Sequence, residues 1–175
     1  MPIERSSRRI PSARLGSEAR SLLRASALCA IATVSPGGRA HVNTAYFTHN
    51  ARFEIVWLSA PEAQHSRNVR DRGTVAIAVF DSTQTWGKPD RGIQLFGRAR
   101  ECRGRDEAAA RRLYRRRFRA YAGDERSTYR FYRFRPTEMK LFDERRLGGG
   151  TFVTASIGRN GTLRWRRTEV ASEQK

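Results

Sequence analysis

A polar run from Ser59 to Arg67, SAPEAQHSR, contains the side chains of this chain that are best suited to chemistry. It follows the apolar, strand-like stretch 53–58 and has the pattern of a helix start. Ser59 and Glu62 have the spacing of a capping box, and Pro61 falls in the first turn, where its missing N–H is not needed. A strand that leads into a helix N-terminus leaves backbone N–H groups beside the positive end of the helix dipole. We therefore predict that this corner holds the phosphate end of a cofactor.

The side chains that follow in the same turn support this hypothesis but leave a simpler one open. Gln64, His65, Ser66 and Arg67 add hydrogen-bonding and cationic groups to the corner, and a protonated histidine there could pair with a phosphate. The alternative is a surface helix with nothing bound, in which Ser59 serves only as the cap. The residues of the corner alone do not decide between the two.

The composition is compatible with a single domain and with an anionic partner. The chain of 175 residues is long enough for a sizeable core, and its formal net charge is +18. Of the 35 basic residues only Lys88, Lys140 and Lys175 are lysines, and the arginines are spread along the chain with one dense run at 111–119. Such a charge permits binding of nucleic acid or another polyanion without identifying it. A polyanion-binding barrel is therefore an alternative function.

Cysteines, histidines and apolar segments argue against several classes of protein. Cys29 and Cys102 fall in strand-like runs without C-x-x-C spacing, which indicates buried thiols in a reducing, cytoplasmic compartment. The three histidines are scattered, so no metal site is expected. The apolar run 28–34 is far shorter than the roughly 18 residues of a membrane span and lacks a signal-peptide pattern. No membrane association is expected.

The order of the expected elements indicates mostly antiparallel strands joined by short turns. Residues 1–15 are polar and are expected to form a flexible tail, and residues 16–170 are expected to form one domain. Helices are expected at 15–27, 60–71 and 106–121. Strands are expected at 28–34, 39–48, 53–58, 74–80, 92–103, 129–135, 139–142, 152–157 and 163–166. This mainly β pattern favours an antiparallel β-barrel with peripheral helices over a doubly wound parallel sheet.

Five short segments, taken in order, resemble a known family. They are HVNTAYF (41–47), VWLS (56–59), HSRNV (65–69), TVAIAVF (74–80) and GIQLFG (92–97). Together they resemble the pyridoxamine 5′-phosphate oxidase-like family of FMN-binding split barrels, over about residues 18–145. The resemblance implies an antiparallel split β-barrel that forms a homodimer, with FMN at the subunit interface. It also implies an oxidoreductase that acts on a small molecule, which the sequence does not identify.

The resemblance assigns cofactor-binding positions one by one. One strand would run along the flavin ring and the ribityl chain, and the next strand would end beside them. The first turn of the following helix would take the phosphate, and Gln94 would reach the flavin. Apolar neighbours flank Gln94, so we expect its amide to be buried. The expected cofactor-binding residues are Asn43, Thr44, Ala45, Tyr46, Phe47, Thr48, Leu58, Ser59, Gln64, His65, Arg67 and Gln94.

The sequence departs from the family on the phosphate side. Asn43, Thr48, Gln64 and His65 stand where the family usually has Arg or Lys, so four charge-assisted contacts are missing. Arg67, or the helix N-terminus itself, could compensate in part. Some members of the superfamily use the deazaflavin F420 or haem instead, and these are alternative cofactors. A cofactor-binding module without turnover is an alternative function.

Two further features limit what the sequence assigns. No general acid or base has a recognisable signature, so no catalytic residue is assigned. The C-terminal substrate-binding segment of true pyridoxamine phosphate oxidases is not visible around Trp165, so vitamin B6 oxidation is not predicted as the activity. Trp86, in the loop 81–91, is expected to cover the core.

Overall fold

The computed structural model describes residues 2–121 and 128–171. Contacts within the chain divide it into two compact units. The first unit consists of Met1–Ser26, Ala78–Leu95 and Thr137–Lys175, and the second of Ala27–Ile77 and Phe96–Pro136. Three strands, β5, β6 and β7, have residues in both units, and the single domain expected over 16–170 stays a prediction.

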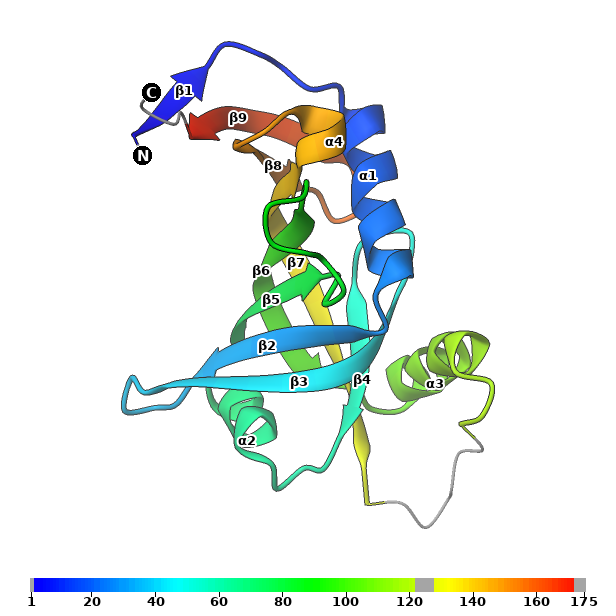
Figure 1. Cartoon of the computed structure of the whole chain (residues 1–175). Helices are drawn as coiled ribbons and strands as arrows, with labels where there is room; N and C mark the ends of the chain where they lie inside the picture. The colour runs from blue at the N-terminus through cyan, green and yellow to red at the C-terminus, as the bar shows by residue number, and fades with distance from the viewer. Residues whose placement is uncertain (1, 122–127, 172–175) are drawn as a thin grey trace. The chain divides into compact units, whose positions relative to one another are not determined.

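The described part of the chain contains nine strands and four helices (Figure 1). The strands are β1 (Ile3–Ser6), β2 (Leu28–Val34), β3 (Ala40–His49), β4 (Ile55–Ser59), β5 (Thr74–Phe80), β6 (Arg91–Glu101), β7 (Arg130–Asp143), β8 (Thr151–Ile157) and β9 (Leu163–Ala171). The helices are α1 (Ser12–Ala25), α2 (Gln64–Asp71), α3 (Arg105–Arg117) and α4 (Glu144–Leu147). No helix among the described residues is long and apolar enough to cross a membrane.

Hydrogen bonding arranges the strands in the order β1-β9-β8-β7-β4-β3-β2-β5-β6, and a further pairing joins β7 to β6. That last pairing closes six strands, β2 to β7, into an antiparallel barrel. Burial alternates along β2 and β5, so that every second residue points into the barrel, whereas the residues at the ends of both strands are exposed. The sequence-based prediction of a split β-barrel with peripheral helices is confirmed.

Gly97 lies where the backbone of β6 closely approaches that of β7. A Cβ atom at this position would lie 2.1 Å from the carbonyl oxygen of Arg135 and 2.8 Å from the Cα of Pro136. No side chain fits in that space, so only glycine lets the two backbones come together here. The glycine within this strand thus has a steric cause.

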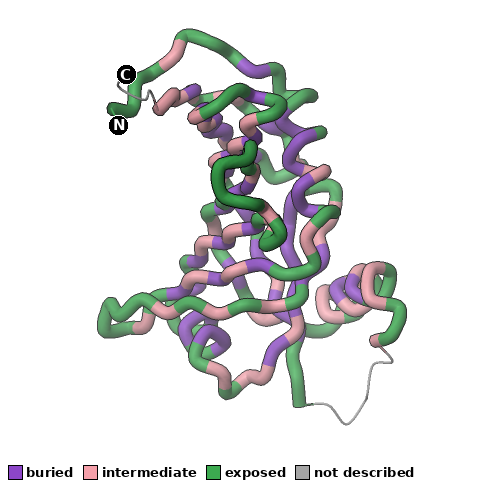
Figure 2. Tube along the Cα trace, viewed as in Figure 1, coloured by how far each residue is buried: buried purple, intermediate pink, exposed green. Residues whose placement is uncertain are grey.

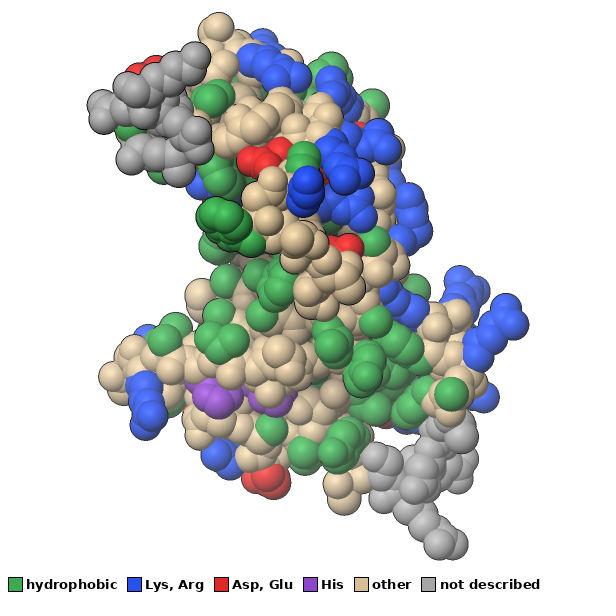
Figure 3. All heavy atoms as spheres, viewed as in Figure 1, with side chains coloured by type: hydrophobic (Ala, Val, Ile, Leu, Met, Phe, Trp, Pro, Cys, Tyr) green, Lys and Arg blue, Asp and Glu red, His purple; other side chains and the backbone are tan. Residues whose placement is uncertain are grey.

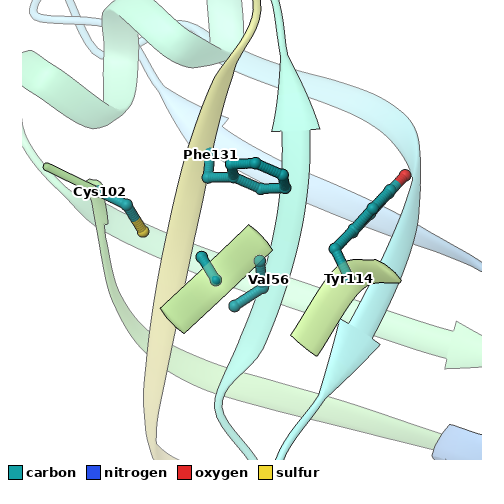
Figure 4. Close-up of a cluster of buried hydrophobic side chains, with 5 residues drawn as sticks. Val56, Cys102, Tyr114 and Phe131 are labelled. Carbon is teal, nitrogen blue, oxygen red and sulfur yellow. The ribbon is translucent and has the colours of Figure 1, made fainter. Parts of the chain in front are cut away.

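The second unit has a compact apolar cluster beneath α3. Val56, Cys102, Ala110, Tyr114 and Phe131 pack there, as Figure 4 shows for the four labelled side chains. Cys102 is a free thiol, and burial, followed by the nearby Asp106 carboxylate, raises its pKa to about 12. The prediction of buried, unpaired cysteines is confirmed, because Cys29 is also free and buried. Neither thiol has the low pKa of a reactive cysteine.

The N-terminal segment differs from the flexible tail expected over 1–15. Ile3 to Ser6 form β1, which pairs antiparallel with β9, and α1 begins at Ser12. α1 buries Leu15, Ala19, Leu22 and Leu23 on one side, and this stripe explains why the helix forms. The sequence did not predict β1 because most of its positions are exposed and the segment has a polar composition.

Two local expectations are also corrected. The segments 129–135 and 139–142 were expected as separate strands, but β7 runs without interruption through Pro136. Trp86 was expected to cover the core, but its side chain is 99% exposed. The strands expected at 152–157 and 163–166 are present as β8 and β9, which pair antiparallel.

Candidate functional site

The corner between β4 and α2 lies entirely within the second unit. β4 ends at Ser59 and α2 begins at Gln64, with Ala63 at the N-cap position and no side chain capping the helix. The predicted capping box of Ser59 and Glu62 is therefore wrong, because a turn closed by Ala63 N–H and the Ala60 carbonyl comes between strand and helix. Without a cap, the backbone N–H groups of the first turn are left for another acceptor.

Ser59 instead forms a buried pair with His65. Its Oγ lies 2.7 Å from Nε2 of His65, and the two residues are 8% and 5% exposed. His41 of β3 lies parallel to the His65 ring, with the ring centroids 6.4 Å apart. Burial, and to a lesser extent the neighbouring His41, lowers the pKa of His65. The ring is therefore neutral near pH 7 and offers a hydrogen bond, not the positive charge that the sequence suggested.

A polar network continues along α2. Gln64 Nε2 donates to Asn68 Oδ1 at 2.8 Å, and Asn68 Nδ2 donates to the Thr33 hydroxyl of β2 at 3.0 Å. The guanidinium of Arg67, which is exposed, donates to Gln64 Oε1 at 2.9 Å and to the Glu62 carbonyl. These bonds hold the helix against the barrel and fix the Arg67 cation at the edge of the corner (Figure 2 shows that one side of α2 is buried and the other exposed).

Ser66 is the most informative side chain of the corner. It is fully buried at 0% exposure, and its hydroxyl has no hydrogen-bond partner among the described residues. A buried hydroxyl without a partner is costly, typically by about 1–3 kcal/mol. A ligand that accepts a hydrogen bond in the first turn of α2 would remove that cost.

The predicted residues of β3 divide between its two faces. Asn43 and Ala45 are half-buried and Phe47 is fully buried, whereas Thr44 and Tyr46 point the other way and are exposed. Asn43 Nδ2 donates to the Thr44 carbonyl at 2.9 Å. Since successive strand residues alternate between faces, all six positions from Asn43 to Thr48 cannot present side chains to one ligand.

The remaining predicted residues are placed differently from one another. Leu58 is half-buried beside Ser59 at the end of β4, as expected. Gln94 was expected to be buried, but it is exposed on β6 and belongs to the first unit. Its apolar neighbours Ile93 and Leu95 point inward. Because successive side chains of a strand alternate between its two faces, the Gln94 amide points outward.

Sequence reasoning missed two members of the corner and named Ser66 there without assigning it to the cofactor. Thr33 and His41 were not assigned, although the structure brings both to the corner or next to it. Thr33 and His41 are opposite each other in the β2–β3 register. The only signal in the sequence was the polar character of these positions within apolar strands.

Comparison with protein families places this geometry in context. The family model described as pyridoxamine 5′-phosphate oxidase matches residues 15–143. The chain belongs to the pyridoxamine 5′-phosphate oxidase family. The resemblance noted over residues 18–145 is thereby confirmed, and a split barrel is the architecture expected of a pyridoxamine 5′-phosphate oxidase family member. No curated protein matches the chain.

Solved structures share the fold of this pyridoxamine 5′-phosphate oxidase family member at low sequence identity. The haem-binding protein from Mycobacterium smegmatis is 21% identical, with a TM-score of 0.70 over 87% of this chain and 60% of its own. ChuZ from Campylobacter jejuni is 12% identical, with a TM-score of 0.69 over 89% of this chain and 63% of its own. A protein related to general stress protein 26 from Clostridium acetobutylicum is 13% identical, with a TM-score of 0.63 over 82% of this chain and 95% of its own. The chain therefore spans about three fifths of the first two structures.

Proposed function

We propose that this chain binds FMN and acts as an oxidoreductase on a small molecule. The observation that carries the proposal is the buried, unpartnered hydroxyl of Ser66 in the uncapped first turn of α2. A phosphate monoester accepts hydrogen bonds from both kinds of donor, hydroxyl and backbone N–H, and is favoured at the positive end of a helix dipole. Membership of the pyridoxamine 5′-phosphate oxidase family supports a cofactor of this type.

The donors of the corner fit a phosphate that is held mainly by neutral groups. The helix N-terminus and the Ser66 hydroxyl supply neutral donors, and Arg67 supplies the nearby cation. His65 adds no charge because its pKa is lowered. When FMN is bound it supplies the hydride chemistry, and the protein orients the ring and holds the phosphate.

Haem is a second candidate, favoured by the two parallel imidazoles of His41 and His65. Neutral imidazole is a common axial ligand of haem iron, and the lowered pKa of His65 keeps its ring in the neutral form. The similar fold of a haem-binding protein from Mycobacterium smegmatis adds weight to this candidate. Both cofactors are therefore tested on the same preparation.

Binding of FMN and of riboflavin to the purified, cofactor-free protein tests the proposal, because the two differ by the phosphate. We expect FMN to bind at least about tenfold more tightly, a difference of about 1.4 kcal/mol. Arg67→Gln and Ser66→Ala should each remove much of that preference and leave riboflavin binding unchanged. Arg52→Gln, which removes an exposed arginine from the β3–β4 turn, is the matched control.

Flavin fluorescence quenching provides the measurement, and a parallel haemin titration followed at the Soret band tests the second candidate. Equal affinity for FMN and riboflavin would contradict phosphate recognition at α2. Tight haemin uptake that is lost in His41→Ala, without FMN binding, would support the second candidate instead.

We also propose that the chain forms a homodimer through the outer face of the β2–β3 ribbon. Leu28 and Tyr46 are opposite each other on this face, and Val34 and Val42 extend it. Their exposed fractions are 48%, 58%, 36% and 65%, respectively, so this face presents an apolar strip that is interrupted only by Thr44 among the exposed residues of β3 between Val42 and Tyr46. An exposed strip of this kind is typical of an interaction surface.

A charge placed in the strip tests this proposal. Val42→Glu should convert a dimer to a monomer, because an unpaired carboxylate at the centre of an interface costs several kcal/mol. Sedimentation velocity on the wild type and the variant at the same concentration gives the result. Thr162→Glu, an exposed position in the β8–β9 turn, is the control and should leave the mass unchanged. A monomeric wild type at micromolar concentration would disprove the proposal.

A further inference from the structure

The outward side of α3 carries a row of arginines. With 3.6 residues per turn, Arg105, Arg112, Arg115 and Arg116 fall within an arc of about 100° around the helix axis. All four are exposed, and Figure 3 shows Lys and Arg side chains standing out over this helix. We call these four residues the α3 arginine row. The opposite side of the helix, with Ala110 and Tyr114, is buried in the apolar cluster described above.

The acidic residues of α3 are engaged elsewhere. Asp106 pairs with Arg133 at 2.8 Å and with Arg100 at 2.6 Å, and Glu107 pairs with Arg111 at 3.0 Å. Within residues 2–121 and 128–171, no member of the α3 arginine row forms an ion pair. The row is therefore an uncompensated strip of positive charge.

The row is not explained by the stability of the helix. Arg112 and Arg116 are four residues apart, where like charges destabilise a helix by roughly 0.2–0.5 kcal/mol. Arg105 is the first helical residue, next to the positive end of the dipole, which disfavours a cation. Only Arg115 and Arg116, in the last turn, are favourably placed. A bound anion would remove the repulsion along the whole row.

We propose that the α3 arginine row binds the phosphodiester backbone of nucleic acid. Arg105 and Arg116 are eleven residues apart, which corresponds to about 16 Å along the helix axis. A nucleic acid strand carries one phosphate per roughly 3.4 Å, so several phosphates come within reach of the row at once. The planar guanidinium forms paired hydrogen bonds to phosphate, which suits arginine to this contact.

The same geometry argues against a lipid surface as the partner. A helix that lies in a membrane interface inserts an apolar face beside its basic face. The apolar side of α3 is already covered within the second unit, and the only other exposed residue within the arc is Ala108. Because the proposed contacts are to phosphate groups, which carry no sequence information, we expect binding to be independent of base sequence.

Salt-dependent binding of the full chain tests the proposal. Fluorescence anisotropy is measured with a labelled 20-base-pair DNA duplex and a labelled 20-nucleotide RNA, between 50 and 300 mM NaCl. Two variants with the same loss of charge are compared. The test variant is R105Q/R112Q/R115Q/R116Q, and the control is R39Q/R52Q/R159Q/R166Q, in which all four positions are exposed.

We expect the wild type to bind at least one of the two probes, with log affinity falling steeply as log salt concentration rises. In the test variant the plot of log affinity against log salt concentration should be less steep, with the magnitude of its slope reduced by roughly 3–4. Each lost phosphate contact accounts for about 0.9 of that reduction. The control variant should lower it by less than 1. Circular dichroism melts of both variants confirm that they remain folded.

Three results would overturn the proposal. These are equal losses in the two variants, an unchanged slope in the test variant, and binding to phosphatidylserine vesicles without binding to either nucleic acid. The proposal does not depend on FMN, because the α3 arginine row is separate from the corner of α2. If the nucleic-acid proposal fails, the FMN proposal is unaffected, and the reverse also holds.

Discussion

A Gly97→Ala variant is expected to lose about 3 kcal/mol or more of its free energy of unfolding, at the upper end of what overpacking costs. The added Cβ would lie 2.1 Å from the Arg135 carbonyl oxygen, so one of the two backbones must move. Because Gly97 lies where β6 closes on β7, that movement would open the barrel seam. Urea unfolding followed by far-UV circular dichroism measures the difference.

Gly37→Ala is the matched control for this experiment. Gly37 lies in the β2–β3 turn, and a Cβ there would meet no atom within 4 Å. Its stability should change by less than about 0.5 kcal/mol, as for most surface substitutions. If Gly97→Ala were as stable as Gly37→Ala, the close approach of β6 and β7 would be incorrect.

An Arg133→Met variant is expected to lose about 3–5 kcal/mol, because it leaves a buried carboxylate without its main partner. Glu54 is 3% exposed and accepts from Asn50 at 2.7 Å and from Arg133 at 3.1 Å. Arg133, with a side chain 11% exposed, also pairs with Asp106 at 2.8 Å. Replacing Glu54 as well, in the double variant Glu54→Met and Arg133→Met, should restore much of the loss.

Arg135→Met is the graded control, because Arg135 pairs with the same carboxylate through a side chain that is 57% exposed. Its loss should be below about 1 kcal/mol. A loss in Arg133→Met no larger than this would show that Glu54 is solvated. Thermal and urea unfolding of the wild type, the two single variants and the double variant measure these differences in stability.

The same carboxylate gives a pH dependence with a definite sign. Burial alone would raise the pKa of Glu54, but Asn50, Arg133 and Arg135 outweigh it and lower the pKa below its ordinary value of 4.5. The unfolded chain therefore takes up the proton first as the pH falls. The stability that Glu54 contributes is complete above about pH 4.5 and is lost as the pH falls through the folded pKa. The stability advantage of the wild type over Glu54→Gln should shrink over that range.

The barrel could be predicted from the sequence because its strands alternate in the ordinary way. β2 and β5 bury every second residue, and the hairpin turns carry Gly and Asn where the backbone requires them. The α2 boundary was missed because Ser59 has the right spacing for a cap but takes His65 as its partner instead. Spacing alone cannot reveal that competition between a backbone N–H and a side chain.

The composition of the corner depended on register, which the sequence does not fix. Thr33 reaches Asn68 across 35 residues, and His41 reaches His65 across 24, so both contacts depend on how β2 and β3 pair. A shift by one residue would turn each side chain to the opposite face. The burial of Gln94 was predicted wrongly for a related reason, since apolar neighbours in a strand do not show which way a given side chain points.

The pairing of β1 with β9 has a consequence for how this chain folds during synthesis. Ile3 is opposite Ala171, and Ser6 is opposite Thr168, so β1 is synthesised well before β9, the strand with which it pairs. The first unit is assembled from three stretches separated by the second unit. Contacts between such distant parts of a chain form slowly, and the waiting edges are prone to aggregate. We therefore expect refolding to be slow, and premature termination before β9 to leave β1 and β8 exposed for capture by chaperones.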